Sequence, residues 1–153
     1  MTQKNLLLAI AFACLAAVGL AMAGQHVYDM RPCPWCVLQR LIYLVIALVA
    51  LVGAFSRWRL PALSLTLLLS LCGVASAAWQ HFVAAKSDSC KLTLADKIVS
   101  GIGLDRLAPD WFQVTASCAE AIVAVLGVPF DIWSLTLFVL LAAGSLLALR
   151  STS

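Results

Sequence analysis

Apolar residues gather in four long stretches of this chain, at residues 5–24, 37–55, 62–85 and 133–149. Each stretch is close to the length of about 20 residues that an α-helix needs to cross a hydrocarbon core of roughly 30 Å, and the last is the shortest. The pattern therefore predicts four transmembrane helices. They are joined by a short polar segment at 25–36, a tight turn at 56–61 and a long segment at 86–132.

The overall composition supports a membrane protein. Of the 153 residues, 63% are hydrophobic and 11% are charged, and the mean hydropathy is +1.02. A chain with so few polar side chains cannot cover the surface of a water-soluble globule. No repeat, low-complexity tract or flexible linker divides it, so we expect one all-α membrane domain over residues 1–153, built as a four-helix bundle with a long second outer loop.

The charged residues predict how the helices are oriented. All seven acidic residues fall in segments 25–36 and 86–132, whereas the other helix ends are flanked only by basic residues, namely Lys4, Arg57, Arg59 and Arg150. Because cytoplasmic loops carry the excess of Lys and Arg, both termini are expected in the cytoplasm and the two acidic segments outside it. The basic residues form no stripe with interleaved aromatic residues, so the formal charge of +3 does not indicate nucleic-acid binding.

The first apolar stretch has some features of a cleavable signal peptide, because Lys4 precedes it and Ala21-Met22-Ala23 resembles a cleavage site. Its apolar core of about 19 residues is longer than the usual 7 to 15 or so of a signal peptide. Keeping it also gives an even number of helices. We therefore expect a retained membrane anchor.

The long segment 86–132 contains a weakly amphipathic stretch at 92–107. Apolar Leu94, Ile98 and Ile102 alternate there with charged residues, which suggests a short helix lying on the membrane surface. Gly101 and Gly103 disfavour a continuous helix.

Candidate chemistry begins at Cys33-Pro34-Trp35-Cys36, where a polar segment runs into the second apolar stretch. A Cys-x-x-Cys pair can cycle between dithiol and disulfide, and the positive end of a helix dipole favours its thiolate. Arg40 follows one helical turn after Cys36, roughly 6 Å deeper at 1.5 Å per residue. An arginine inside a membrane helix is costly, which indicates a functional role for Arg40.

The six cysteines divide by predicted depth. Cys14 and Cys72 lie inside helices and are expected to pack as small apolar residues, while Cys33, Cys36, Cys90 and Cys118 face the outside. A Cys-x-x-Cys disulfide closes too small a ring to stabilise a loop, so the first outer pair indicates redox chemistry. Cys90 and Cys118 could be structural, redox-active or both. A zinc site with four cysteines is disfavoured because only one closely spaced pair is present.

Two cysteine pairs on one side of a membrane suggest an electron relay. A soluble dithiol protein could reduce Cys90 or Cys118, and Cys33 and Cys36 could then pass two electrons and two protons to a membrane quinone. Arg40 would stabilise negative charge on a quinone oxygen. His81, near the outer end of the third helix, could donate a hydrogen bond or proton to the quinone, or could belong to the interfacial belt of aromatic and amphipathic residues.

The chain resembles the disulfide bond formation protein B (DsbB) family of bacterial inner-membrane proteins. The shared features are the four helices, Pro32-Cys33-Pro34-Trp35-Cys36 at the start of the second helix, Arg40, Gln80-His81, Cys90, Cys118-Ala119-Glu120, Leu126-Gly127 and Trp133. One departure is the run Ile122-Val123-Ala124-Val125, where some members carry a tryptophan before Leu-Gly.

The resemblance implies a quinone-dependent thiol oxidase that regenerates a periplasmic DsbA-like thiol oxidase. It further implies that Cys90 and Cys118 form the disulfide attacked by the partner, that Cys33 and Cys36 form the quinone-proximal pair, and that Arg40 and His81 contact the quinone. The residues leave open whether the quinone is ubiquinone or menaquinone, which DsbA-like protein is the partner, how the cysteines pair at rest, and the oligomeric state.

Two other functions compete with this prediction. An enzyme of the vitamin K epoxide reductase type also has four helices and a Cys-x-x-Cys, but there the loop cysteines come first, the reverse of the order here. A disulfide-stapled membrane scaffold without turnover is the non-enzymatic alternative. Arg40 argues against a scaffold, because a scaffold has no evident use for a membrane-buried arginine below a Cys-x-x-Cys.

Overall fold

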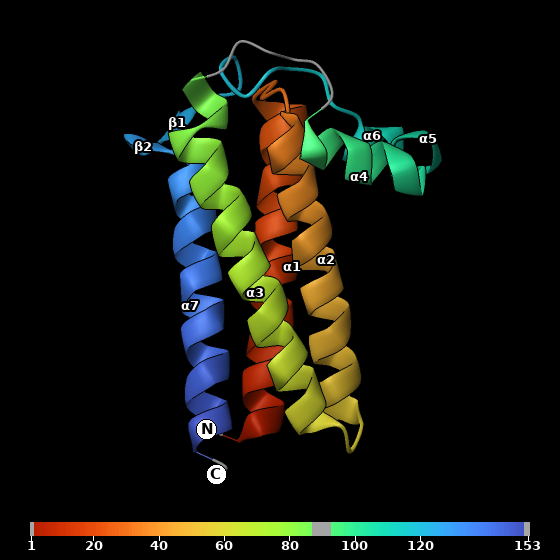
Figure 1. The fold of residues 1–153 in the computed structure, drawn as a ribbon, viewed down its shortest axis with the longest axis vertical. Coiled ribbons are helices and arrows are strands. Elements are labelled where there is room, and N and C mark those ends of the chain that lie inside the picture. The colour runs from red at the N-terminus through yellow and green to blue at the C-terminus, as the bar shows by residue number, and fades with distance from the viewer. Residues whose placement is uncertain (1, 87–92, 152–153) are drawn as a thin grey trace.

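A computed structural model describes residues 2–86 and 93–151 of the chain. Four long helices run side by side as a bundle, and they are α1 (Gln3–Val27), α2 (Pro34–Phe55), α3 (Arg59–Phe82) and α7 (Phe130–Arg150) (Figure 1). All four are long and apolar enough to cross a membrane. The prediction of an all-α protein with four transmembrane helices is confirmed.

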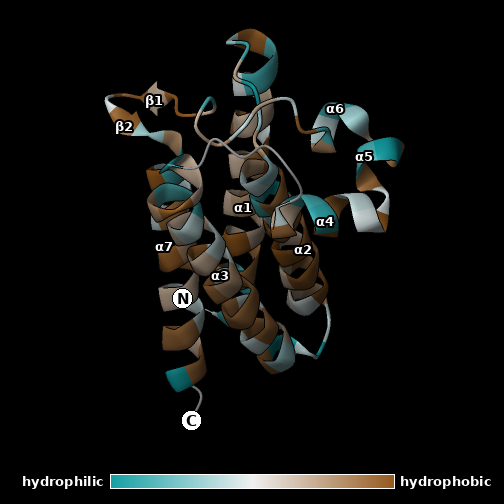
Figure 2. Ribbon diagram, turned by 45° about the horizontal axis from the view of Figure 1, so that its top comes forward, coloured by the Kyte–Doolittle hydropathy of each residue, from teal (hydrophilic) through white to brown (hydrophobic). Residues whose placement is uncertain are grey.

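The smaller elements gather at the end of the bundle opposite the chain termini (Figure 1). They are the 3-10 turn η1 (Ala84–Lys86), the short helices α4 (Leu94–Ile102), α5 (Leu104–Leu107) and α6 (Pro109–Phe112), and the strands β1 (Ala124–Val125) and β2 (Val128–Pro129). We call this the loop end and the other the terminal end. Hydrophobic residues dominate the long helices, whereas hydrophilic residues concentrate toward the loop end (Figure 2).

Local capping sets where the helices begin. α2 starts three residues before the predicted apolar stretch, because the Cys33 side chain accepts a hydrogen bond from the Cys36 backbone N–H and Pro34 occupies the first helical turn. Proline suits that position because its fixed φ matches a helix and its missing N–H would have no partner there. The cap therefore puts the Cys-x-x-Cys in the first turn of α2.

The segment predicted as one short amphipathic helix is divided into two. Thr93 caps α4 by accepting a hydrogen bond from the Asp96 N–H, and the helix ends at Gly103, whose φ of 78° lies in the left-handed region that glycine adopts without strain. Ala95 and Val99 face the protein and Val99 packs with Val37 of α2. That α4 lies on a membrane surface stays a prediction.

An antiparallel hairpin of β1 and β2 precedes α7, and the sequence did not predict it. Leu126 and Gly127 form its turn, both with positive φ, and the Trp133 indole N–H donates to the Val125 carbonyl oxygen at 3.1 Å. The hairpin is thereby fixed to the first turns of α7.

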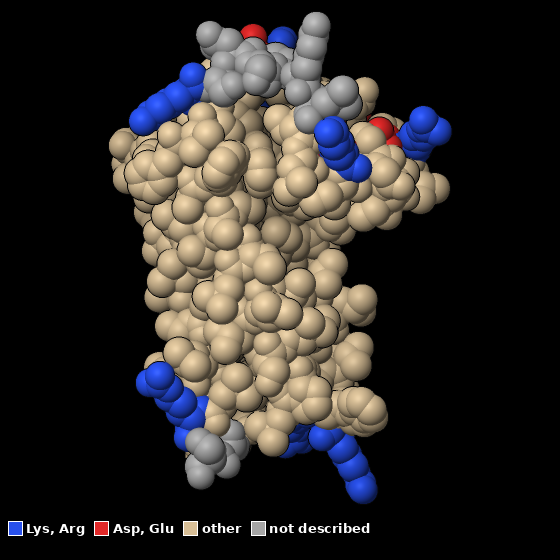
Figure 3. All heavy atoms as spheres, viewed as in Figure 1, with Lys and Arg blue, Asp and Glu red and all other residues tan. Residues whose placement is uncertain are grey.

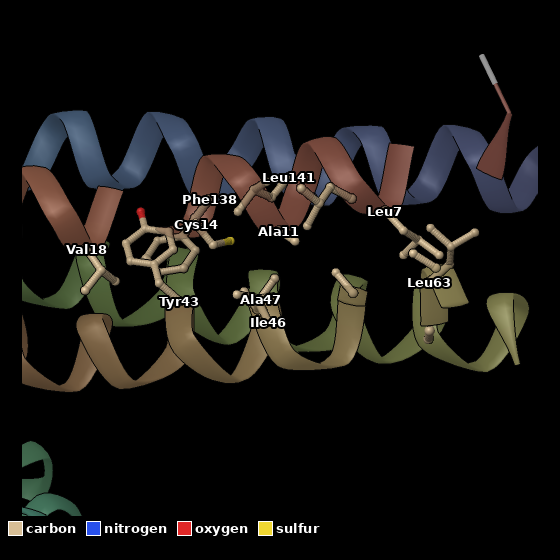
Figure 4. Close-up of a cluster of buried hydrophobic side chains, with 14 of the residues drawn as sticks. Leu7, Ala11, Cys14, Val18, Tyr43, Ile46, Ala47, Leu63, Phe138 and Leu141 are labelled. Atoms are coloured by element: carbon tan, nitrogen blue, oxygen red, sulfur yellow. The ribbon is translucent and has the colours of Figure 1, made fainter. Parts of the chain in front are cut away.

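The core of the bundle is built from buried hydrophobic residues of all four long helices (Figure 4). Cys14 is fully buried in this cluster, whereas Cys72 is exposed on α3. Tyr43 of α2 stacks on Phe138 of α7, with ring centroids 4.2 Å apart. Gly73 of α3 lies directly against the Phe138 ring, so close that a Cβ there would overlap it. Small residues allow such close approach between membrane helices.

Replacing Gly73 with alanine should destabilise the bundle by forcing α3 away from Phe138. Overpacking of this kind typically costs about 1 to 3 kcal/mol. Gly19→Ala on α1 is a matched control, because nothing lies within 4 Å of the added Cβ. Thermal unfolding in detergent should show a lower midpoint for Gly73→Ala and an unchanged or higher one for Gly19→Ala. Equal midpoints for both variants would contradict the close α3–α7 contact.

Candidate redox site

The two cysteines of the Cys-x-x-Cys motif lie together at the start of α2. Their sulfur atoms are 2.9 Å apart, within hydrogen-bonding distance, and the Cys36 backbone N–H is 3.3 Å from the Cys33 sulfur. Cys33 is fully buried and Cys36 is partly exposed. The motif is therefore held at the start of a helix, as the sequence predicted, and the more accessible sulfur lies about one turn deeper.

Cys118 lies on the other side of Cys33, which the sequence could not show. Its side chain interacts with that of Cys33 and with the Trp35 backbone, and it is buried in the same cluster as both residues. The three sulfur-bearing side chains thus follow one another in the order Cys118, Cys33, Cys36. Cys90 lies outside the described residues.

A compact turn holds Cys118 in place. The Ser117 hydroxyl accepts a hydrogen bond from the Glu120 N–H at 3.3 Å, and the Glu120 carboxylate accepts one from the Ser117 N–H at 3.1 Å. The loop just before this turn is connected to the Cys-x-x-Cys segment by a hydrogen bond from the Thr115 N–H to the Pro32 carbonyl oxygen. These contacts fix the late part of the outer loop against the start of α2.

The pKa values of Cys33 and Cys118 are shifted in opposite directions. Hydrogen bonds to Cys118 and Cys36, together with burial, raise the pKa of Cys33 above that of an ordinary thiol. The pKa of Cys118 is lowered, chiefly because its sulfur accepts the hydrogen bond of the Cys33 thiol. Cys118 is therefore the better nucleophile of this pair in the reduced protein, because the thiolate is the reactive form.

Arg40 is buried one turn below Cys36, where the sequence placed it. Its guanidinium donates to the Gln25 side-chain oxygen at 2.6 Å and to the backbone oxygens of Trp111 at 3.3 Å and Ala21 at 3.4 Å. Gln25 in turn donates to the Asp110 backbone oxygen at 3.1 Å. Arg40 therefore joins α2 to the loop end of α1 and to α6, a role that its position in the sequence did not reveal.

A cavity of about 660 Å³ reaches Cys36 and Arg40 from the side of α1 and α7. Its walls are mainly apolar side chains of these two helices, and the hairpin residues Val125 and Leu126 border its outer part. A second cavity, of about 840 Å³, lies between α2, α3 and α4 and borders Cys118, but neither Cys36 nor Arg40 lines it. Of these two cavities, judged on the residues that the structure describes, the first combines a redox-type sulfur with a buried cation.

His81 and Gln80 occupy the outer part of α3 and differ in their contacts. The His81 ring nitrogen Nδ1 lies 2.6 Å from an Asp131 carboxylate oxygen, and Asp131, rather than His81, lines the cavity beside Cys36. The buried Gln80 side chain donates a hydrogen bond to the Cys36 sulfur at 3.2 Å. The pairing of His81 with Asp131 was not predicted from the sequence.

Comparison with known proteins gives a consistent match along the chain. Residues 3–148 match the family model described as disulfide bond formation protein DsbB. The chain is 39% identical over 144 residues to disulfide bond formation protein B 1 of Pseudomonas syringae pv. syringae, covering 92% of this chain and 85% of that protein. It is 33% identical over 144 residues to disulfide bond formation protein B of Herminiimonas arsenicoxydans, covering 92% and 90%.

The opposite pKa shifts predict the order in which the thiols react. In the fully reduced protein near neutral pH, iodoacetamide should modify Cys118 faster than Cys33, since a lowered pKa increases the thiolate fraction and a raised pKa decreases it. Removing the donor with Cys33→Ala should move the Cys118 alkylation profile to higher pH. Mass spectrometry of the modified peptides measures both rates. Faster alkylation of Cys33 than of Cys118 would contradict the hydrogen-bond order.

Proposed function

Because the chain belongs to the DsbB family of disulfide bond formation proteins, we propose that it is a protein dithiol:quinone oxidoreductase that reoxidises a DsbA-like thiol oxidase. The observation that carries the proposal is the row of sulfurs Cys118, Cys33, Cys36, which leads from the outer loop to a cavity lined by Arg40. Such a row offers a path for thiol–disulfide exchange from the loop to the membrane.

The proposed relay begins at a Cys90–Cys118 disulfide. A thiolate of the reduced partner attacks it, and the partner's second thiolate then resolves the mixed disulfide, so that the partner leaves oxidised and Cys90 and Cys118 become a dithiol. The Cys118 thiolate next attacks Cys33 of a Cys33–Cys36 disulfide and releases the Cys36 thiolate. Attack of Cys90 on Cys118 restores the loop disulfide and frees Cys33, so two electrons have moved to the Cys33–Cys36 pair.

The position of Cys118 beside Cys33 supports the transfer between the two pairs. Cys118 is the attacking group, and its side chain already lies with that of Cys33 in one buried cluster. The turn at Ser117 and Glu120 and the tie between Thr115 and Pro32 limit how far Cys118 moves between exchanges. Holding Cys118 next to Cys33 lowers the entropic cost of bringing the two sulfurs together for exchange.

The 660 Å³ cavity suits a quinone. Its apolar walls match an isoprenoid chain, Cys36 is available at its inner side, and Arg40 supplies a fixed positive charge. A quinone bound there would accept two electrons and two protons. The Arg40 guanidinium would stabilise negative charge on a quinone oxygen, while Gln25 and the backbone oxygens hold that guanidinium in place. His81, through Asp131, is the proposed route by which protons reach the cavity from outside.

Charge distribution supports an orientation with both termini in the cytoplasm and the loop end in the periplasm of a bacterial inner membrane. On the face in Figure 3, Lys and Arg appear at both ends, Asp and Glu only at the loop end, and the belt between is free of charge. The basic residues at the terminal end fit the positive-inside rule. This orientation exposes the loop cysteines to an oxidising compartment and to a soluble partner.

The proposal predicts that Cys118→Ala or Cys90→Ala abolishes quinone reduction driven by a reduced thioredoxin-like oxidase. The Cys33–Cys36 pair of these variants should still be oxidised by added quinone, because the inner pair and the cavity are intact. Cys72→Ala is the matched control, since Cys72 is exposed on α3 and belongs to neither proposed cysteine pair. Quinone absorbance in detergent with native lipids follows the reaction. Wild-type turnover by both loop variants would show the loop cysteines to be structural.

Arg40→Leu should weaken quinone use by about ten- to a hundredfold, the effect of losing a charge-assisted hydrogen bond of about 1.5 to 3 kcal/mol. Arg40→Lys should be impaired less, because it keeps the charge but loses the planar fork. Arg40 has two proposed roles, stabilising the quinone and connecting α2 with α1 and α6. Gln25→Leu tests the second role, since it removes a side chain that links Arg40 and α1 to α6 but leaves the guanidinium in place. Measurement of apparent quinone affinity should rank Arg40→Leu as the most impaired. Equal effects of Gln25→Leu and Arg40→Leu would make Arg40 a structural clamp.

A further inference from the structure

A series of hydrogen-bonded polar side chains, three of them buried, leads away from Cys36 through three helices. Gln80 of α3 donates to the Cys36 sulfur at 3.2 Å, and the side chain of Gln39 on α2 donates to the Gln80 oxygen at 2.7 Å. The Ser134 hydroxyl of α7 donates to the Gln39 oxygen at 2.6 Å. Tyr43 of α2 ends the chain, with its hydroxyl 3.0 Å from that of Ser134.

The chemistry of the groups fixes the direction of this chain. A glutamine side chain donates through its nitrogen and accepts through its oxygen, so Gln80, which donates to Cys36, accepts from Gln39. Gln39 likewise accepts from Ser134. Because Ser134 has a single hydroxyl proton and gives it to Gln39, the Tyr43 hydroxyl is the donor toward Ser134, and it can donate to the hydroxyl oxygen or to the backbone carbonyl oxygen of Ser134. Every hydrogen bond between the side chains of this series points toward the Cys36 sulfur.

These polar side chains lie in membrane-spanning helices, where burying them is energetically unfavourable unless they are hydrogen-bonded. Gln39, Gln80 and Tyr43 are each at most 7% exposed within membrane-spanning helices. Buried amides and hydroxyls are unfavourable in an apolar environment unless they are hydrogen-bonded. An aligned chain also polarises its members, so that the last donor binds a negatively charged acceptor more strongly than an isolated amide does.

We propose that Gln39, Ser134 and Tyr43 position the Gln80 amide so that it stabilises the thiolate of Cys36. This inference rests on the proposed function only in that Cys36 is the sulfur released from the Cys33–Cys36 disulfide and presented to the quinone. Gln80 touches the reacting sulfur, and the other three act through it. The electrons and protons of the relay are unchanged, because the chain only holds the leaving sulfur in its charged form.

Other charged or titratable groups near Cys36 are left in place by the test. Cys33 and Arg40 act on it from α2, Asp131 of α7 and Arg31 line the same cavity, and Cys118 lies beyond Cys33. The pair His81 and Asp131 joins α3 to α7 and is not part of the hydrogen bonds that link Tyr43, Ser134, Gln39, Gln80 and Cys36. A change in Cys36 reactivity that depends on this hydrogen-bonded series should therefore appear when one of its residues is replaced at a time.

The experiment is site-resolved alkylation of Cys36 by iodoacetamide in the reduced full-length protein across a range of pH. Gln80→Leu should move the Cys36 profile to higher pH by about one unit or more, as expected for loss of a hydrogen bond to a charged group. Ser134→Ala, which leaves Gln80 in place but misaligns Gln39, should move it in the same direction by roughly 0.3 unit. Ser145→Ala should leave it unchanged.

Ser145 is a matched control because it is fully buried on the same helix as Ser134, and its hydroxyl donates to the Leu141 backbone oxygen at 2.8 Å. A Gln80→Leu profile that superimposes on the wild type would overturn the proposal, as would equal shifts for Ser134→Ala and Ser145→Ala. If Gln80→Leu fails to fold, the comparison of the two serine variants still decides. Alkylation requires neither quinone nor partner, so a shifted profile in a protein without quinone turnover would refute the proposed function alone.

Discussion

A polar group in the hydrocarbon of a bilayer must find its hydrogen-bond partners within the protein, because no water is available there. In the half of the bundle near the terminal end, the buried serines meet this constraint within their own helices, as Ser70 does with the Thr66 carbonyl oxygen. Near the loop end, Arg40 and Gln39 instead bond to other helices. Arg40 reaches α1 and α6, and Gln39 reaches α3 and α7. The same constraint that makes these residues costly thus fixes the geometry around Cys36.

The start of α2 is the point at which these contacts meet. Cys33 caps the helix, Cys36 lies in its first turn, and Arg40 lies in its second turn. The outer loop is bound to this segment through the contact of Cys118 with Cys33 and the hydrogen bond that Arg40 donates to the Trp111 carbonyl oxygen. A soluble partner and a membrane quinone act on opposite sides of α2 in this account, and α2 connects them through one short row of sulfurs.

Much of this arrangement follows from the sequence because it depends on local pattern. Hydropathy alone locates the four long helices, and the spacing of Cys33, Cys36 and Arg40 within one helix fixes their relative depth. Contacts between distant segments do not follow in this way. The neighbours of Arg40 and the partner of His81 lie on other helices, and nothing in the spacing of Cys118 indicates that it meets Cys33 rather than Cys36. The hairpin before α7 was also missed, because an unbroken apolar run gives no alternation typical of strands.

The central claim is that Cys118 exchanges directly with Cys33, and one disulfide measures it most directly. In a variant carrying Cys36→Ala and Cys90→Ala, each pair has lost one member, so Cys33 and Cys118 are left without their proposed disulfide partners. Mild oxidation in the membrane, followed by mass spectrometry of the unreduced peptides, should show a disulfide between Cys33 and Cys118 within single chains. Two thiols that remain free, or that form disulfides only between chains, would contradict the account.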